Sequence, residues 1–193
     1  MRKLKIIEPI SLDGVIQVSG EDGDFPYGDW TAPYRTPAGR DVILAAYGAR
    51  FDLLLGHRTY DLWSGFWPKA PGSPMADRLN AATKFIATHC PESLEWGPFE
   101  GLGPDIIESI HRIKSPDGPD LILSGSSLTS TLLEHGLADE VWLIVYPVLL
   151  GTGKRFFREG TPPRAFELAN TKALSSGIVI NAYQAAGPLK NQP

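Results

Sequence analysis

The chain has 193 residues, of which 42% are hydrophobic and 21% are charged, and its formal net charge is −4. This length and composition are those of one globular domain that can bury a substantial core. We therefore expect residues 1–193 to form a single domain, with a frayed tail at residues 186–193. The negative net charge argues against a general nucleic-acid binder, which is normally basic.

The cysteine content and the N-terminus indicate the compartment. Cys90 is the single cysteine, which excludes an intramolecular disulfide and fits a reducing environment. The first ten residues, MRKLKIIEPI, hold only a brief apolar run that Glu8 and Pro9 interrupt, too short for a signal peptide or a membrane span. We expect a cytoplasmic protein without membrane partners.

The first predicted strand covers residues 4–10 and opens into Ser11-Leu12-Asp13-Gly14. A carboxylate just past a strand end lies where open α/β sheets place their ligands. Asp13 is therefore a candidate to face a substrate, with Ser11 assisting by a hydrogen bond. The alternative is a turn in which Asp13 bonds its own backbone.

Residues 19–37 predict an irregular loop, because they are rich in glycine, aspartate and proline. The same segment carries four aromatic side chains: Phe25, Tyr27, Trp30 and Tyr34. A long loop with this many aromatic residues is typical of a binding loop or lid. An interface loop that packs on a partner subunit explains the pattern equally well.

A helix is predicted over residues 39–50, followed by a buried strand over residues 51–55. The strand ends at Gly56-His57-Arg58-Thr59-Tyr60, a glycine at a strand-to-helix turn. An arginine and a threonine in a first helical turn can bind a phosphate by charge and by hydrogen bonds. Tyr60, Trp63 and Trp67 then recur at helical spacing, which favours core packing over a cofactor-binding stripe.

Further strands and helices follow in alternation. We expect a helix over residues 75–82, a strand over residues 84–87, a strand around Leu94 to Trp96, and a helix from Pro104 that includes Ile106, Ile110 and Ile113. The strand over residues 84–87 ends in Thr88-His89. His89 could donate a hydrogen bond to a nucleotide or stack on its base, or be an ordinary surface histidine.

Residues 120–157 hold the most informative pattern. A short apolar run at residues 121–123 stops at Ser124-Gly125-Ser126-Ser127, and helical spacing begins at Leu128. A strand that turns through glycine and serine into a helix directs free N–H groups at an anion, commonly a nucleotide phosphate. Residues 141–145 are apolar throughout, as expected of a strand covered on both faces.

Two more strands, over residues 166–174 and 177–183, are predicted to form an antiparallel hairpin at the sheet edge. Several chemistries are not signalled. The chain has neither the Walker phosphate loop nor the complete glycine fingerprint of Rossmann dehydrogenases, and its histidines lack partners at metal-ligand spacing. We expect no metal site.

Four motifs together resemble the dihydrofolate-reductase-like superfamily, and within it the riboflavin-biosynthesis reductase domain, the RibD C-terminal domain family. They occur in the family's order and span most of the chain. The motifs are residues 11–14 (SLDG), 55–60 (LGHRTY), 123–126 (LSGS), and 137–140 (LADE) through 147–153 (PVLLGTG). One departure stands out, because the family commonly has two adjacent glycines where this chain has Gly125-Ser126.

The resemblance implies a three-layer α/β/α sandwich with a mostly parallel central sheet and a C-terminal antiparallel hairpin. It also implies that NADPH lies across the carboxyl ends of the strands and gives a hydride to a pyrimidine- or pterin-like substrate. By position, Asp13 and Ser11 would be catalytic. The cofactor would be bound by Gly56, His57, Arg58, Thr59, Thr88, His89, Gly125, Ser126, Ser127 and Leu128.

The expected function is an NADPH-dependent reductase similar to 5-amino-6-(5-phosphoribosylamino)uracil reductase, acting on a small molecule as a homodimer. One alternative is a nucleotide-binding protein of the same fold that lacks reductase activity. The other is a dihydrofolate reductase, which needs an acidic residue on the helix after the aromatic loop, where Asp41 is the nearest candidate.

Overall fold

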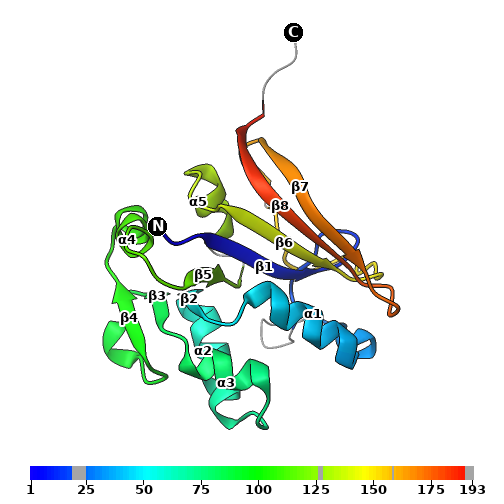
Figure 1. Cartoon of the computed structure of the whole chain (residues 1–193), viewed down its shortest axis with the longest axis horizontal. Coiled ribbons are helices and arrows are strands. Elements are labelled where there is room, and N and C mark those ends of the chain that lie inside the picture. The colour runs from blue at the N-terminus through cyan, green and yellow to red at the C-terminus, as the bar shows by residue number, and fades with distance from the viewer. Residues whose placement is uncertain (19–24, 126–127, 158, 190–193) are drawn as a thin grey trace.

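A computed structural model describes residues 1–18, 25–125, 128–157 and 159–189, and it is built on one eight-stranded sheet (Figure 1). The strand order is β4-β3-β2-β5-β1-β6-β8-β7. The six strands from β4 to β6 in this order run parallel, and β8 and β7 are antiparallel to their neighbours. The predicted three-layer α/β/α fold with a C-terminal hairpin is confirmed.

Most of the predicted elements are present, with shifted ends. The strands are β1 (Leu4–Ile10), β2 (Phe51–Gly56), β3 (Lys84–Ala87), β4 (Phe99–Leu102), β5 (Asp120–Leu123), β6 (Glu140–Val145), β7 (Arg164–Ala173) and β8 (Val179–Pro188). The helices are α1 (Pro37–Tyr47), α2 (His57–Phe66), α3 (Pro74–Ala81), α4 (Ile106–Lys114) and α5 (Thr129–Glu134). Three short 3-10 turns, at Ala32–Tyr34, Trp67–Lys69 and Pro91–Ser93, complete the set in the described ranges.

Helices cover both faces of the parallel strands, and each strand divides its apolar side chains between two cores. Ile7, Leu53 and Ile122 belong to the core that α1, α2 and α3 cover. Ile6 and Leu121 belong to the opposite core, which α4 and α5 cover. In Figure 1, α1 to α3 lie below the central strands and α5 lies above them. Burial on both faces explains why these strands read as continuous apolar runs.

The helix starts follow local capping chemistry. The hydroxyls of Thr36 and Ser73 and the carboxylate of Asp105 accept hydrogen bonds from backbone N–H groups in the first turns of α1, α3 and α4. Proline also lies at the start of α1 and of α3, where its missing N–H group costs nothing. These caps fix where the helices begin.

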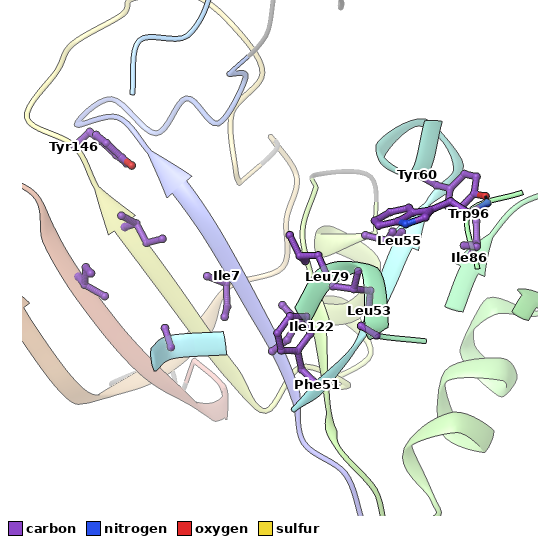
Figure 2. Packing of buried hydrophobic residues seen from close by; sticks show 14 of the residues in the cluster. Ile7, Phe51, Leu53, Leu55, Tyr60, Leu79, Ile86, Trp96, Ile122 and Tyr146 are labelled. Atoms are coloured by element: carbon purple, nitrogen blue, oxygen red, sulfur yellow. Dashed lines mark hydrogen bonds between the residues drawn. The ribbon is translucent and has the colours of Figure 1, made fainter. Parts of the chain in front are cut away.

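One predicted strand is wrong. Residues 94–96 form a loop instead, and the edge strand β4 begins at Phe99. The apolar side chains of Leu94 and Trp96 are buried within this loop. The Tyr60 hydroxyl accepts hydrogen bonds from the N–H groups of Glu95 (2.8 Å) and Trp96 (2.6 Å). Figure 2 shows Tyr60 and Trp96 together at one end of this core and Tyr146 at the other. Tyr60 is thus a core residue, as its helical spacing predicted.

Strand β3 begins with a buried lysine. Lys84 has no exposed surface; its Nζ atom donates to the carbonyls of Asn80 (2.8 Å) and Gly97 (3.1 Å) and lies 4.3 Å from the centre of the Trp96 ring. Burial lowers the pKa of Lys84 to about 8, against the opposing effect of Asp52. The ammonium group joins α3, β3 and the loop before β4.

The C-terminal hairpin and its neighbouring strand β6 each differ from prediction. β8 continues to Pro188, which pairs with Arg164, so residues 186–188 are part of the sheet and not of a frayed tail. Strand β6 is not covered on both faces, because Trp142, Leu143 and Val145 are only half-buried. On the α5 side, Leu143 lines an open apolar groove with four other side chains: Val141, Phe157, Phe166 and Tyr183.

In the four described ranges no helix is long and apolar enough to cross a membrane.

The central position of β5 makes a simple test of the core. Ile122 is fully buried, so Ile122→Ala should lower the free energy of unfolding by about 3 kcal/mol through lost burial and an unfilled cavity. Leu168→Ala, on the exposed part of β7, is the matched control and should change it by less than about 0.5 kcal/mol. Urea denaturation measures both, and equal effects would contradict this description of the core.

Candidate functional site

The predicted site residues gather at one edge of the sheet, because parallel strands all end at the same edge. β3, β2, β5 and β1 are consecutive neighbours in the sheet. The segments that follow them carry the cofactor-site and catalytic candidates. Thr88 follows β3, His57 follows β2, Gly125 lies just past β5, and Asp13 lies just past β1.

His57 and Thr88 are in direct contact. The Nδ1 atom of His57 lies 2.6 Å from the Thr88 hydroxyl, which also accepts a hydrogen bond from the Cys90 N–H group at 3.0 Å. On its other side, Nε2 of His57 lies 3.3 Å from a carboxylate oxygen of Asp61, one helical turn along α2. The imidazole is partly exposed, so it can meet a ligand at the N-terminal end of α2. When protonated it would add positive charge there.

Gly125 is in close contact with Thr59, in the first turn of α2. Its backbone has a φ of +109°, and a Cβ atom added to it would lie 2.5 Å from the Thr59 hydroxyl oxygen. Both facts require glycine at this position. The end of β5 and the start of α2 therefore approach as closely as backbone and side chain allow. A dinucleotide phosphate needs a backbone cradle of this kind.

The remaining cofactor-site candidates are less well placed. Arg58 and His89 are exposed at this same edge, and Gly56 is the buried residue at which β2 passes into α2. The side chain of Leu128 packs against the core on the α4 and α5 side, so only its backbone could face a ligand. The other two predicted residues, Ser126 and Ser127, lie outside the described residues. Helix α5 has only six residues, so its dipole contributes little.

The hydrogen bonds of the Asp13 carboxylate are made within the chain and are not confined to its own turn. Its carboxylate accepts hydrogen bonds from the Ser11 hydroxyl (2.6 Å) and from the N–H groups of Leu150 (3.2 Å) and Gly151 (2.8 Å). The Nη2 atom of Arg155 lies 3.8 Å away. These bonds join the loop after β1 to the loop after β6. Ser11 also accepts from the N–H group of Val15, so it is part of the same junction.

This environment determines the charge of Asp13. The Ser11 hydroxyl has the largest effect and burial opposes it, while the Leu150 and Gly151 amides add to it, so that the pKa of Asp13 is lowered to about 2. Asp13 is therefore a carboxylate at neutral pH. It can orient a polar group or stabilise positive charge, but it holds no proton to give.

Glu8 is a second carboxyl group near this edge, and our sequence interpretation treated it only as an interruption of an apolar run. It is 5% exposed on β1, and its Oε1 atom accepts a hydrogen bond from the Gly125 N–H group. Burial raises the pKa of Glu8 to about 8, opposed only in part by that hydrogen bond. A signal was present, because alternation along β1 places Glu8 on the same face as Ile6 and Ile10.

The aromatic loop packs on its own chain. Trp30 is buried and meets Tyr146, at the end of β6, edge to face with ring centres 5.3 Å apart. Tyr34 makes a similar contact with Tyr146 at 5.9 Å. Arg35, next in the chain, pairs with Asp29 at 2.7 Å and remains half-exposed. The described part of this loop thus forms a wall beside the carboxyl end of β6, whereas residues 19–24 lie outside the description.

A search of the described residues for three or more histidine, cysteine, aspartate or glutamate side chains able to hold one metal ion found none.

Comparisons with known proteins agree with this fold. Residues 106–180 match the family described as RibD C-terminal domain. The structure resembles a putative riboflavin biosynthesis protein from Shewanella, with a TM-score of 0.73 and 19% identity over 96% of this chain and 99% of that one. The resemblance to the RibD C-terminal domain family is confirmed.

Two further relatives extend the comparison. The protein YyaP of Bacillus subtilis, described as uncharacterized, is 26% identical over 188 residues, which cover 94% of each chain. A diaminohydroxyphosphoribosylaminopyrimidine deaminase/5-amino-6-(5-phosphoribosylamino)uracil reductase from Thermotoga maritima has a TM-score of 0.65 at 18% identity. This chain spans 57% of the Thermotoga protein, and at such identity the likeness establishes the fold alone.

The segment matched to the RibD C-terminal domain family covers one part of the site. It runs from α4 into β8 and so includes Gly125 and the loop at residues 147–153 whose amides bind Asp13. Asp13 itself, His57 and Thr88 lie before it. Their assignment depends on the geometry and on the resemblance of the earlier motifs.

The contact between Gly125 and Thr59 can be tested by one added methyl group. Gly125→Ala should lower the free energy of unfolding by about 2 kcal/mol or more, because a left-handed backbone disfavours alanine and the new Cβ would overlap Thr59. Gly65→Ala, on α2 with open space around it, should be neutral or stabilise by up to about 1 kcal/mol. Thermal and urea unfolding of both variants give the comparison, and an unaffected Gly125→Ala protein would refute the contact.

Glu8 should make stability depend on pH. Its folded pKa of about 8 lies above the ordinary 4.5, so its stabilising contribution is complete below about pH 4.5 and is lost as pH rises through about 8. Relative to Glu8→Gln, whose side chain does not ionise, the wild type should lose about 1.4 kcal/mol per pH unit within that window. Urea denaturation of both proteins at several pH values measures the difference, and parallel pH profiles would contradict the burial of Glu8 as an acid.

Proposed function

We propose that this protein is an NADPH-dependent reductase that transfers a hydride to a pyrimidine- or pterin-like heterocycle. The supporting observation is the meeting of three predicted cofactor segments, through the His57–Thr88 contact and the Gly125–Thr59 contact. The RibD C-terminal domain match adds support, as does the likeness in fold to the Thermotoga protein described as a deaminase/reductase. The Thermotoga relative suggests 5-amino-6-(5-phosphoribosylamino)uracil as the kind of substrate.

Each part of the site has a distinct task in this proposal. The bound nicotinamide would supply the hydride, and the protein supplies binding and orientation. Gly125 and Thr59 accommodate the cofactor phosphates, while His57 and Thr88 recognise the 2′-phosphate by charge and hydrogen bonding. Asp13, as a permanent carboxylate, orients the substrate or a water that carries the proton. The Trp30 and Tyr146 rings border the substrate side.

A second candidate function is nucleotide binding without reduction. The state of Asp13 favours it, because three of its hydrogen bonds come from the chain itself and its pKa of about 2 leaves it without a proton to donate. The dihydrofolate reductase alternative has weaker support, since Asp41 is exposed on α1. The homodimer and the cytoplasmic location expected from the sequence stay proposals, which gel filtration with light scattering and cell fractionation would test.

The deciding experiment compares cofactors before substrates. NADPH binding and NADH binding are measured by fluorescence titration, and NADPH oxidation is then followed with a panel of pyrimidines, pterins and folates. Turnover of a ribosylaminopyrimidine supports the reductase. Tight NADPH binding without turnover on any compound supports the second candidate, and the absence of binding to both cofactors refutes both.

The role of His57 predicts a change in cofactor preference. His57→Ala should weaken NADPH binding about tenfold and leave NADH binding nearly unchanged, because only NADPH carries the 2′-phosphate to which the imidazole would hydrogen-bond. Asp61→Asn is the matched control: it removes the carboxylate beside the imidazole and should keep or raise NADPH affinity. Equal losses for both cofactors in His57→Ala would show that the histidine supports only the fold.

Asp13 should affect catalysis more than binding. Asp13→Asn should leave the NADPH dissociation constant within about threefold of wild type while slowing turnover about tenfold or more, because the substrate loses an oriented charge. Ser11→Ala tests the neighbouring hydrogen bond and should have a smaller effect in the same direction. A parallel loss of cofactor affinity and turnover in Asp13→Asn would instead identify Asp13 as a structural tie between the loops.

A further inference from the structure

The carboxyl group of Glu8 is enclosed by the sheet at the point where β1 passes the end of β5. Its neighbours on the same face of β1 are Ile6 and Ile10, both buried, and its partner across the ladder on β6 is Leu143. An isolated charge in such surroundings is costly, and the neutral acid is the stable form. Glu8 is therefore placed to act as a hydrogen-bonding group and not as an ion.

The group it binds is the peptide of Gly125. The Gly125 N–H group donates to Glu8, and the Gly125 carbonyl accepts from the Thr129 hydroxyl at 3.1 Å. The Thr59 side chain fills the space that a Cβ atom on Gly125 would need. One residue earlier, the Ser124 hydroxyl donates to the Ile7 carbonyl at 3.1 Å. Residues 124–125, called here the Gly125 turn, are thus held by β1 on one side and by α2 and α5 on the others.

We propose that Glu8 is a positioning residue whose neutral carboxyl group holds the Gly125 turn in the geometry that accepts a dinucleotide phosphate. This inference rests on the proposed function, because it takes the Gly125 turn as part of the cofactor site. Ionisation of Glu8 would place a negative charge one hydrogen bond away from the phosphate site. It would also leave an uncompensated anion in the sheet, and both effects oppose cofactor binding.

The other titratable groups near Glu8 do not mask this effect. On α1, the Tyr47 hydroxyl is close enough to Glu8 for a charge on Glu8 to raise its pKa. Burial, offset in part by the Ser124 hydroxyl and increased by Glu8, raises the pKa of Tyr47 to about 12. Strand β5 contributes Ser124 and Gly125, α5 contributes Thr129 and α2 contributes Thr59, none of which ionises in this range. Glu8 alone among these groups changes charge between about pH 7 and about pH 9.

The test uses the full-length protein and two substitutions. Glu8→Gln keeps an oxygen to accept the Gly125 N–H group but never carries charge, whereas Glu8→Leu removes the acceptor. In wild type, the dissociation constant of NADPH should rise about tenfold from about pH 7 to about pH 9, as expected when only the protonated form binds. In Glu8→Gln it should stay within about twofold over that range.

Glu8→Leu should bind NADPH more weakly than wild type already at about pH 7, and without this pH dependence. An NADPH affinity that falls with pH in wild type but not in Glu8→Gln is a result that a purely structural role would not give. The same pH profile in wild type and Glu8→Gln would overturn the proposal.

A second measurement is independent of any ligand. In ¹⁵N-labelled protein, the amide resonance of Gly125 should shift with a midpoint near pH 8 in wild type and should not titrate in Glu8→Gln. If wild type binds no NADPH at any pH, the proposed function fails, and the Gly125 titration still decides whether Glu8 controls the turn. An amide that does not titrate, or that titrates alike in both proteins, would overturn the inference whatever the cofactor result.

Discussion

A parallel sheet must be covered on both faces, and this constraint accounts for most of the molecule. Six neighbouring strands run in one direction, and helices lie on both faces of them, α1 to α3 on one face and α4 and α5 on the other. The same direction brings every strand end with a polar or glycine-rich turn to one edge. The fold and the location of the candidate site are thus two results of one geometric rule.

Two carboxyl groups of one chain segment show how strongly the surroundings decide chemical character. Asp13 lies just beyond β1 and receives three hydrogen bonds, and its pKa falls to about 2. Glu8 lies five residues earlier inside the sheet, where burial raises its pKa to about 8. The pair divides into a permanent anion and a neutral acid at physiological pH, a separation that active sites commonly use.

The elements that could be predicted from the sequence are those in which one signal dominates. The apolar runs of β1, β2 and β5 and the capped start of α4 can each be recognised from a few consecutive residues. The strand expected at residues 94–96 failed because Trp96 is buried in a loop by contacts with Tyr60, from a distant helix. Side-chain burial alone does not distinguish a strand from a well-packed loop.

The place where the candidate residues meet could be expected in outline for the same reason. Glycine, serine and threonine at the strand ends indicated this edge of the sheet, and made His57, Thr88 and Gly125 candidate site residues. The bonds of Asp13 to Leu150 and Gly151 were not foreseeable, since they join positions 137 and 138 residues apart. The contact of Glu8 with Gly125 depends on the pairing of β1 with β5, whereas the burial of Glu8 was already implied by strand alternation.

The position of β1 has a consequence for how the chain folds. β1 is made long before its ladder partners, β5 and β6, and the bond between Glu8 and Gly125 spans 117 residues. During synthesis this apolar strand stays unpaired until β5 and β6 have left the ribosome. Such long-range pairing slows folding and exposes an unpaired edge in the meantime. The pairing of β1 is therefore completed only after β5 and β6 have been made, although β1 precedes both in the sequence.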